Sequence, residues 1–243
     1  MLRGALLISC VVTLLAFPAA AKQPHRASAE TSDFQRDVEL YPEALRAAND
    51  AMSDSGLDSN PHVYVTVPRD QTAADRQRAE EILSILRNSM AKYKDYRAAI
   101  ADGYQPFMPK TDQPLYWFIS NRNAYASAYE FNPGHPTCLL YKKSKGAYRL
   151  TGALFTAPKN ATESQLNARV PLGVARWHEH VNLCVAPNRA SQHQSGAKKF
   201  GLGGTIVTRG DCAAAGGRWV PQVFGWMVAV FPFEDNPASI WPH

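Results

Sequence analysis

From Gly103 onward, the sequence consists of short apolar segments separated by turns rich in Pro, Gly and Asn. The length of these segments and their β-branched or aromatic content are typical of strands. They cover residues 115–120, 137–143, 148–157, 172–184, 218–220 and 226–231. The sequence Ser144-Lys145-Gly146 predicts a hairpin turn between the second and third segments. Because strands that follow one another through short turns pair antiparallel, this part of the chain predicts a largely antiparallel sheet.

The residues before Gly103 predict helices instead. After Thr72, apolar side chains recur at three- and four-residue spacing and therefore form one stripe along a helix. They are Ala79, Ile82, Leu83, Leu86, Met90 and Tyr93. Residues 42–51 and 96–101 predict shorter helices, and residues 63–67 predict a strand. Helices followed by consecutive strands predict an α+β fold, with N-terminal helices packed on a sheet that is either open or curled into a partial barrel.

The first residues have the pattern of an export signal. Arg3 is followed by an uncharged apolar run, residues 4–21, which ends in small residues before Lys22. This pattern predicts a signal peptide, residues 1–21, and a periplasmic or extracellular protein without a transmembrane span in its mature chain. Residues 22–60 are mostly polar and predict a linker with one short helix, so a single domain is expected over residues 61–243.

The charge of the chain is modest. It has 26 Lys and Arg residues and 21 Asp and Glu residues, which gives a net charge of +5. The only basic clusters are residues 142–145 and 198–199, and both lie beside glycine in predicted turns. Because nucleic-acid binding needs a basic stripe with stacking aromatic residues or a known motif, the sequence indicates no nucleic-acid partner.

Three of the four cysteines follow the predicted signal peptide. Cys184 and Cys212 flank a glycine-rich segment, and an oxidising compartment favours a disulfide between them. Cys212 is expected on a short helix between Gly210 and Gly216. Cys138 lies in an apolar strand-like run, which predicts a buried free thiol and not a nucleophile.

Chemistry-bearing side chains concentrate in residues 176–184, where His178 and His180 flank Glu179. In a regular strand successive side chains alternate between faces, so the two imidazoles share one face and stand about 7 Å apart along the strand. Cys184 is expected on the same face as the histidines. Glu179 is expected on the opposite face, among apolar neighbours that would raise its pKa and suit it to acid or base catalysis.

Two histidines can begin a site for a divalent transition metal, but such a site needs three or four ligands. The third ligand would have to come from elsewhere in the chain. Candidates are His135, which follows a Pro-Gly turn, together with Glu130 and His193. The alternative is that His178 and His180 have a structural or surface role.

Several segments together resemble a known family. Ala101-Asp102-Gly103-Tyr104 precedes an aromatic strand that ends in Asn, residues 116–121, and Phe131-Asn132-Pro133 precedes Pro136-Thr137-Cys138. Residues 148–153 and the histidine strand follow. This order is similar to an uncharacterised family of exported bacterial proteins, which pair a Tyr-His-aromatic strand with a later strand containing histidine. Trp117 stands where the first histidine of that family would be, so one ligand that the resemblance implies is missing here.

Two classes of function follow. The first is an exported binding or envelope-associated module, whose partner is a small ligand or an envelope component. The second is a metal-dependent enzyme in which His178 and His180 hold the ion and Glu179 is a candidate acid or base. Six large aromatic residues could line a ligand cleft, although their strand-like surroundings favour core packing. They are Tyr116, Trp117, Trp177, Trp219, Trp226 and Trp241.

Overall fold

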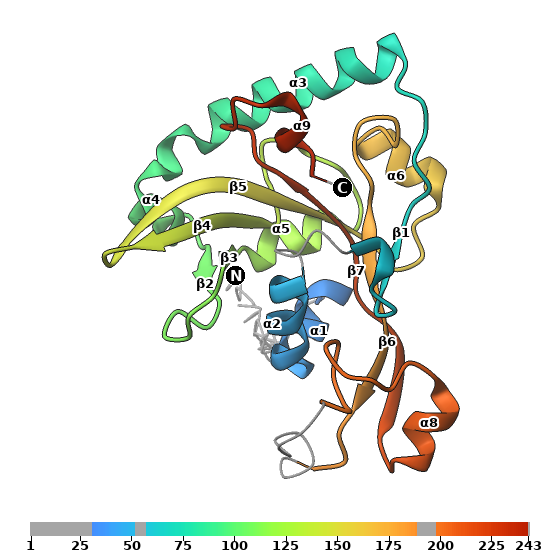
Figure 1. Cartoon of the computed structure of the whole chain (residues 1–243). Coiled ribbons are helices and arrows are strands. Elements are labelled where there is room, and N and C mark those ends of the chain that lie inside the picture. The colour runs from blue at the N-terminus through green and yellow to red at the C-terminus, as the bar shows by residue number, and fades with distance from the viewer. Residues whose placement is uncertain (1–30, 52–56, 189–197, 243) are drawn as a thin grey trace, which may run out of the picture. The chain divides into compact units, whose positions relative to one another are not determined.

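The computed structural model describes residues 31–51, 57–188 and 198–242, and its central element is an antiparallel sheet of seven strands (Figure 1). The strands are β1 (Val63–Val65), β2 (Gln105–Pro106), β3 (Tyr116–Ile119), β4 (Cys138–Ser144), β5 (Ala147–Ala157), β6 (His178–Val185) and β7 (Arg218–Val230). Their order in the sheet is β1-β6-β7-β5-β4-β3-β2. Because β1 and β2 are left as edges, the sheet is open and does not close into a barrel. The predicted α+β class is confirmed.

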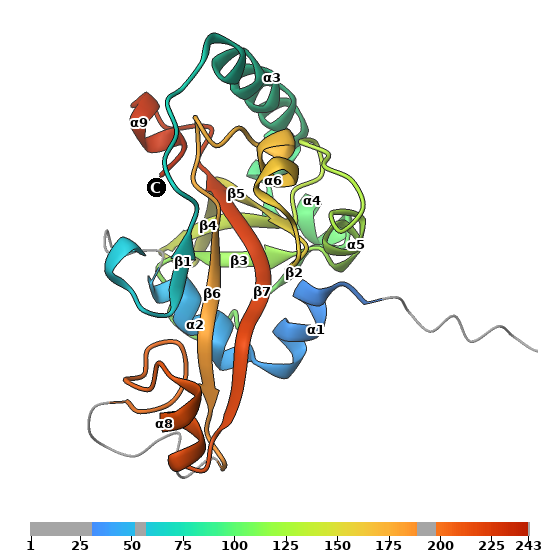
Figure 2. The ribbon, with the colours of Figure 1, turned by 90° about the vertical axis from the view of Figure 1, so that its right-hand side faces the viewer.

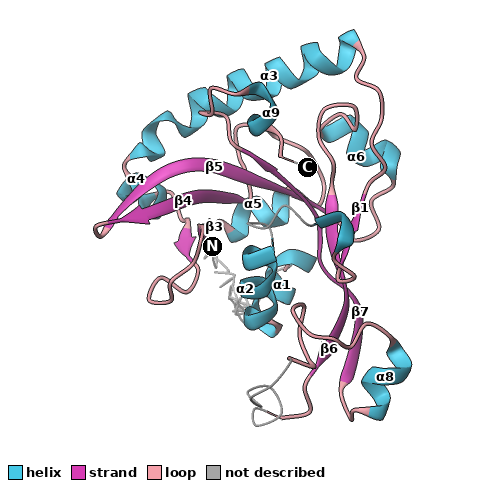
Figure 3. Cartoon of the chain, in the orientation of Figure 1, coloured by secondary structure: helices cyan, strands magenta, loops and turns pink. Residues whose placement is uncertain are grey.

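Helices lie on both faces of this sheet. They are α1 (Asp33–Leu40), α2 (Pro42–Ala51), α3 (Ala73–Met90), α4 (Tyr96–Ala101), α5 (Asn121–Ala126), α6 (Glu163–Arg169), α8 (Arg209–Ala214) and α9 (Pro237–Ile240). Figures 1 and 2 show α3 on one side of β4 and β5, and α1 and α2 on the other side. In Figure 3, β6 and β7 continue past α1 and α2 to the end of the sheet that carries α8.

The strands distribute their alternate side chains between two hydrophobic cores. On the α3 side, Leu86 packs in one cluster with Phe118 and Leu139. On the α1–α2 side, the next residues along the strands, including Trp117 and Leu140, pack in a second cluster. This alternation is the expected result of the period of two in a strand. The expected core role of the large aromatic side chains is confirmed for Tyr116, Trp117, Trp177 and Trp226, all of which are buried.

Short sequence patterns predicted the start of one helix and the position of one hairpin turn correctly. Helix α3 begins after Thr72, whose side chain and that of Asp75 form a reciprocal capping box. The structure adds a second capping box, at Thr162, after which α6 begins. The predicted hairpin joins β4 to β5, and its central residues Lys145 and Gly146 both have positive φ, 49° and 81°. Such angles match the right-handed twist of the two strands.

Two expectations are wrong. The stretch expected to be a linker with one short helix contains two helices. The helix predicted over residues 42–51 is confirmed as α2, whereas α1 is an additional helix, and the side chains of Phe34 and Leu45 on these helices are buried in the core on that side of the sheet. The domain therefore includes these helices and does not begin at residue 61. The strand expected from residue 172 begins only at His178, because Pro171 starts a turn in which its carbonyl accepts from the Val174 and Ala175 amides. The predicted signal peptide lies outside the described residues.

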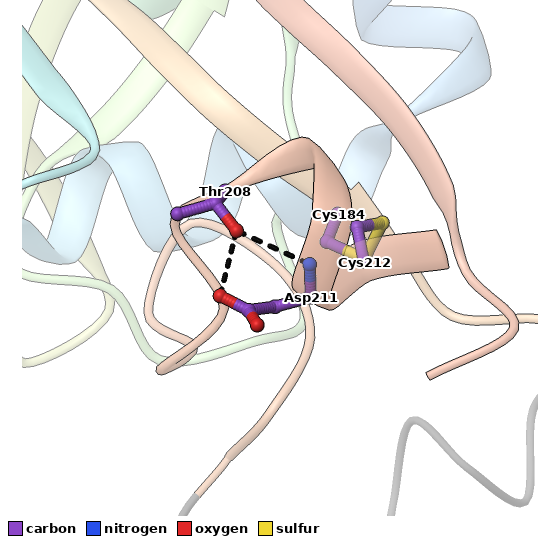
Figure 4. Close-up of a disulfide and its surroundings, with 4 residues drawn as sticks. All are labelled: Cys184, Thr208, Asp211 and Cys212. Atoms are coloured by element: carbon purple, nitrogen blue, oxygen red, sulfur yellow. Dashed lines mark hydrogen bonds between the residues drawn. A yellow bond between two sulfur atoms is a disulfide. The ribbon is translucent and has the colours of Figure 1, made fainter. Parts of the chain in front are cut away.

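The predicted disulfide is confirmed, and it fastens α8 to the end of β6 (Figure 4). Cys184 and Cys212 are both fully buried. The side chain of Thr208 caps the first turn of α8 by accepting from the Asp211 amide. A Cβ on Gly217 would lie 2.6 Å from the Cys184 sulfur, so a residue with a side chain does not fit there. Cys138 is a buried free cysteine, as expected.

Removal of this disulfide is expected to destabilise the protein markedly. The bridged cysteines are 28 residues apart in the sequence. In the chain-entropy model, closing a loop of this length stabilises the folded state by about 3 to 4 kcal/mol. Urea unfolding of a Cys184→Ala, Cys212→Ala double variant should show that loss, and reductant should bring the wild type to the same midpoint. Equal stability of the unreduced wild type and the double variant would contradict this expectation.

In the part of the chain that the structure describes, no helix is both long and apolar enough to cross a membrane.

Candidate functional site

The pairing of the histidine strand β6 with β7 is interrupted by a β-bulge next to Glu179 and His180. Glu179 pairs with Trp226, but His180 pairs with Val223, so two residues of β7 are inserted between these pairs. They are Phe224 and Gly225, with φ of 71° and 77°. A Cβ on Gly225 would lie 2.5 Å from the Ala157 carbonyl oxygen, which restricts this position to glycine. Bulges of this kind re-aim side chains and are over-represented next to functional sites.

A buried ion pair holds this bulge in place. The Phe224 amide donates to the Asp37 carboxylate of α1 at 2.8 Å. The Lys159 ammonium lies 2.6 Å from the same Asp37 oxygen. The side chain of Asp37 is only 5% exposed and that of Lys159 is 24% exposed. Helix α1, the β5–α6 connection and β7 therefore meet at one carboxylate.

Glu179 lies beside this pair, on the face of β6 opposite to the histidines, as predicted. The Gln222 side-chain amide donates to the Glu179 carboxylate and also to the Lys159 carbonyl oxygen. Burial raises the pKa of Glu179 to about 6, against the opposing effects of the Gln222 hydrogen bond and the Lys159 charge. The carboxyl group is half-buried, so it can exchange protons with solvent near neutral pH.

His178 and His180 are buried in the core on the α1–α2 side. They are 0% and 1% exposed, and their ring centroids are 5.4 Å apart in an edge-to-face arrangement. The His180 ring also meets the ring of Phe224, at 6.2 Å between centroids. Both ring nitrogens of His180 lack a hydrogen-bond partner among the described residues. Burial, with a smaller effect of nearby His62, lowers the pKa of His180 to about 3, so the imidazole is neutral at ordinary pH.

Within residues 31–51, 57–188 and 198–242, the structure does not bring a third ligand to these histidines. Among the described residues, no group of three or more His, Cys, Asp or Glu side chains could hold a metal ion. His135 is exposed and lines a small cavity with Glu130 and Phe131. His193 lies outside the described residues. Because two imidazoles are fewer than a protein metal site needs, the described residues do not complete the predicted metal centre.

Cys184 does not share the face of the histidines, which corrects the expected alternation. Asn182 has a φ of 59°, and this second irregularity of β6 shifts the alternation by one residue. Leu183 consequently joins the core that contains Val223, whereas Cys184 packs with Cys212 in a separate cluster. The Asn182 side-chain amide is held by the Pro61 carbonyl oxygen at 2.8 Å.

A cavity of about 520 Å³ opens beside this end of β6. One wall is the α1–α2 corner, including Tyr41 and Ala47, and the other is formed by β6 and the segment from Lys198. Four buried apolar side chains belong to its lining: Ala44, Leu183, Cys184 and Leu202. Four charged side chains, two of each sign, complete the lining: Glu43, Arg46, Asp50 and Lys198. The first two form an ion pair at 3.3 Å.

Sequence reasoning missed this cavity and the ion pair of Asp37 and Lys159. Both depend on α1, which the polar composition of its stretch concealed. The one available signal was the spacing of Phe34 and Asp37, which places both on the same side of a helix. Comparisons of the chain with protein-family models, with curated proteins and with solved structures find no match.

Proposed function

We propose that the protein is an exported binding module that holds a small amphipathic molecule in the cavity between the α1–α2 corner and the end of β6. The observation that carries this proposal is the cavity itself, whose volume of about 520 Å³ lies in the range of small-molecule sites. A disulfide at the same end of β6 agrees with an oxidising compartment and thus with export.

The lining of the cavity supports an amphipathic ligand. Leu183 and Leu202 are 2% and 3% exposed and form the apolar bottom of the cavity. Glu43, Asp50 and Lys198 are exposed and offer charges of both signs at the entrance. A ligand with an apolar body and a polar end satisfies both parts, because the apolar body gains from burial while the polar end stays hydrated.

A dye-binding experiment tests the site. The probe is anilinonaphthalene sulfonate, which has an apolar ring system and one charged end and fluoresces when it leaves water. Ala47→Trp places a large side chain in the cavity, since Ala47 is one of its lining residues. Ala74→Trp is the matched control, because Ala74 is exposed on α3 and lines no part of this cavity.

Wild type and Ala74→Trp are expected to bind the dye with the same affinity, and Ala47→Trp is expected to lose binding. The urea midpoints of all three proteins show whether each is folded during the titration. Undiminished dye binding by folded Ala47→Trp, or no binding by the wild type, would contradict the proposed site.

A further inference from the structure

A second cavity, of about 470 Å³, is lined in part by the β5–α6 connection and shares no lining residue with the first. It is bounded by the segment that follows α5, with Tyr129 and Phe131, and by α6, with Gln165 and Arg169. Tyr129 is 71% exposed, so a large part of its ring is accessible to solvent beside this cavity. Its ring packs against Tyr125 at 5.2 Å between centroids, which limits its movement.

Arg169 is the distinctive side chain of this cavity. Its Nη1 donates to the Ser127 carbonyl oxygen at 2.6 Å and to the Thr156 carbonyl oxygen at 3.5 Å. These contacts fix the plane of the guanidinium group and use only one of its nitrogens. Among the described residues, no carboxylate forms an ion pair with Arg169, and no acceptor receives a hydrogen bond from its Nε or Nη2.

The charge of Arg169 is also partly desolvated. The side chain is half-buried, and burial lowers the pKa of its guanidinium group from the ordinary value. A guanidinium group keeps its proton in proteins, so the site retains a positive charge, and no carboxylate of the described residues forms an ion pair with it. Glu130 lines the same cavity, but none of the ion pairs among the described residues joins it to Arg169. A ligand carboxylate can supply the missing acceptors in a two-oxygen geometry that matches the remaining nitrogens.

We propose that this second cavity is a binding site for a small aromatic carboxylate. Arg169 donates hydrogen bonds to the carboxylate, and the rings of Tyr129 and Phe131 pack against the aromatic part of the ligand. Phe131 is itself held by Phe155, at 5.0 Å between ring centroids, so the apolar side of the site is anchored to the sheet. The Gln165 side chain is occupied in capping α6, because its oxygen accepts from the Thr162 amide.

Benzoate is a suitable probe, with benzyl alcohol as a ligand of the same ring without the charge. Calorimetric titration of the full chain should show benzoate binding to the wild type and much weaker binding of benzyl alcohol. Arg169→Met should weaken benzoate binding about 10- to 100-fold, the loss expected for charge-assisted hydrogen bonds. Arg87→Met is the matched control, because Arg87 also donates to a backbone carbonyl, that of Pro232, but lines neither large cavity.

A second variant keeps the proposal testable if Arg169→Met is poorly folded. Ala168→Trp fills the cavity from an exposed position on α6 and leaves the Arg169 hydrogen bonds to the two carbonyls in place. It should abolish benzoate binding while the urea midpoint stays near that of the wild type. No benzoate binding by the wild type, equal affinity for benzyl alcohol, or full binding by Ala168→Trp would each overturn the proposal.

Discussion

Replacement of Asp37 by alanine is expected to lower the free energy of unfolding by about 2 to 4 kcal/mol, because a buried amide and a partly buried lysine both lose a charged partner. The Asp37 carboxylate receives both the Lys159 ammonium and the Phe224 amide. Without it, a lysine that is only 24% exposed loses its partner, and a buried amide loses its acceptor. The Phe224 ring would keep its contact with Phe34 of α1, but the Phe224 amide would lose the hydrogen bond that stabilises the positive φ of this residue.

Three further variants separate the contributions. Asp33→Ala is the matched control in the same helix, because Asp33 is exposed and its ion pair with Arg36 lies at the surface. Such a pair contributes about 0 to 1 kcal/mol. Asp37→Asn keeps an acceptor for the Phe224 amide but removes the charge, and Lys159→Met removes the other partner. Urea unfolding of the single variants and of the double variant gives the coupling energy between Asp37 and Lys159.

A loss at Asp37→Ala no larger than that at Asp33→Ala would show that the pair does not hold the bulge. A loss at Asp37→Asn close to that at Asp37→Ala would assign the effect to the charge. A loss confined to Asp37→Ala would instead assign it to the hydrogen bond from Phe224.

The features that sequence reasoning predicted are those in which local preference and tertiary packing agree. The apolar spacing of α3 places Ile82 and Leu86 on the stripe that packs on the sheet, and Thr72 caps the helix by its own side chain. The hairpin between β4 and β5 follows from Lys145 and Gly146 alone. Each of these signals involves residues close in sequence, so no knowledge of the fold is needed to interpret them.

The candidate sites could be predicted only in part, because they depend on contacts between distant segments. Phe224 adopts a positive φ that its side chain disfavours, and the compensating contact comes from Asp37, 187 positions away in the chain. Alternation in β6 placed Glu179 opposite the histidines correctly but failed at Cys184, because the positive φ of Asn182 intervenes. Arg169 carried no local signal, because its carbonyl partners on Ser127 and Thr156 are brought to it by α5 and β5.

The neutral, buried state of His180 predicts a protein that loses stability in acid. Its pKa is about 3 in the folded state, compared with an ordinary value of 6.5. Below pH 6.5 the unfolded chain binds a proton at this position that the folded chain does not, so the free energy of unfolding falls as the pH falls. Across the whole window, this effect amounts to about 4 to 5 kcal/mol. Glu179 acts in the opposite sense, because its folded pKa is raised from 4.5 to about 6 and its protonation therefore favours folding.

The effect can be assigned to His180 with two variants. His180→Leu removes the titrating group and leaves an apolar side chain of similar size among Val223, Phe224 and Met227. His135→Leu is the control, because His135 is an exposed histidine outside this cluster. Urea unfolding at about pH 7 and about pH 4.5 should show the wild type losing about 2 to 3 kcal/mol more than His180→Leu. His135→Leu should lose as much as the wild type.

His62 and His178 are the other imidazoles near His180, and they decide how the outcome is interpreted. His62 Nε2 donates to the Gly204 carbonyl oxygen at 2.9 Å, and the His178 ring contacts His180 directly. The charge interaction with His62 lowers the pKa of His180 in the same direction as burial does. If His180→Leu keeps the full acid sensitivity of the wild type, the proton uptake belongs to another group. A flattened pH dependence places it at His180, where burial leaves both ring nitrogens without a hydrogen-bond partner among the described residues.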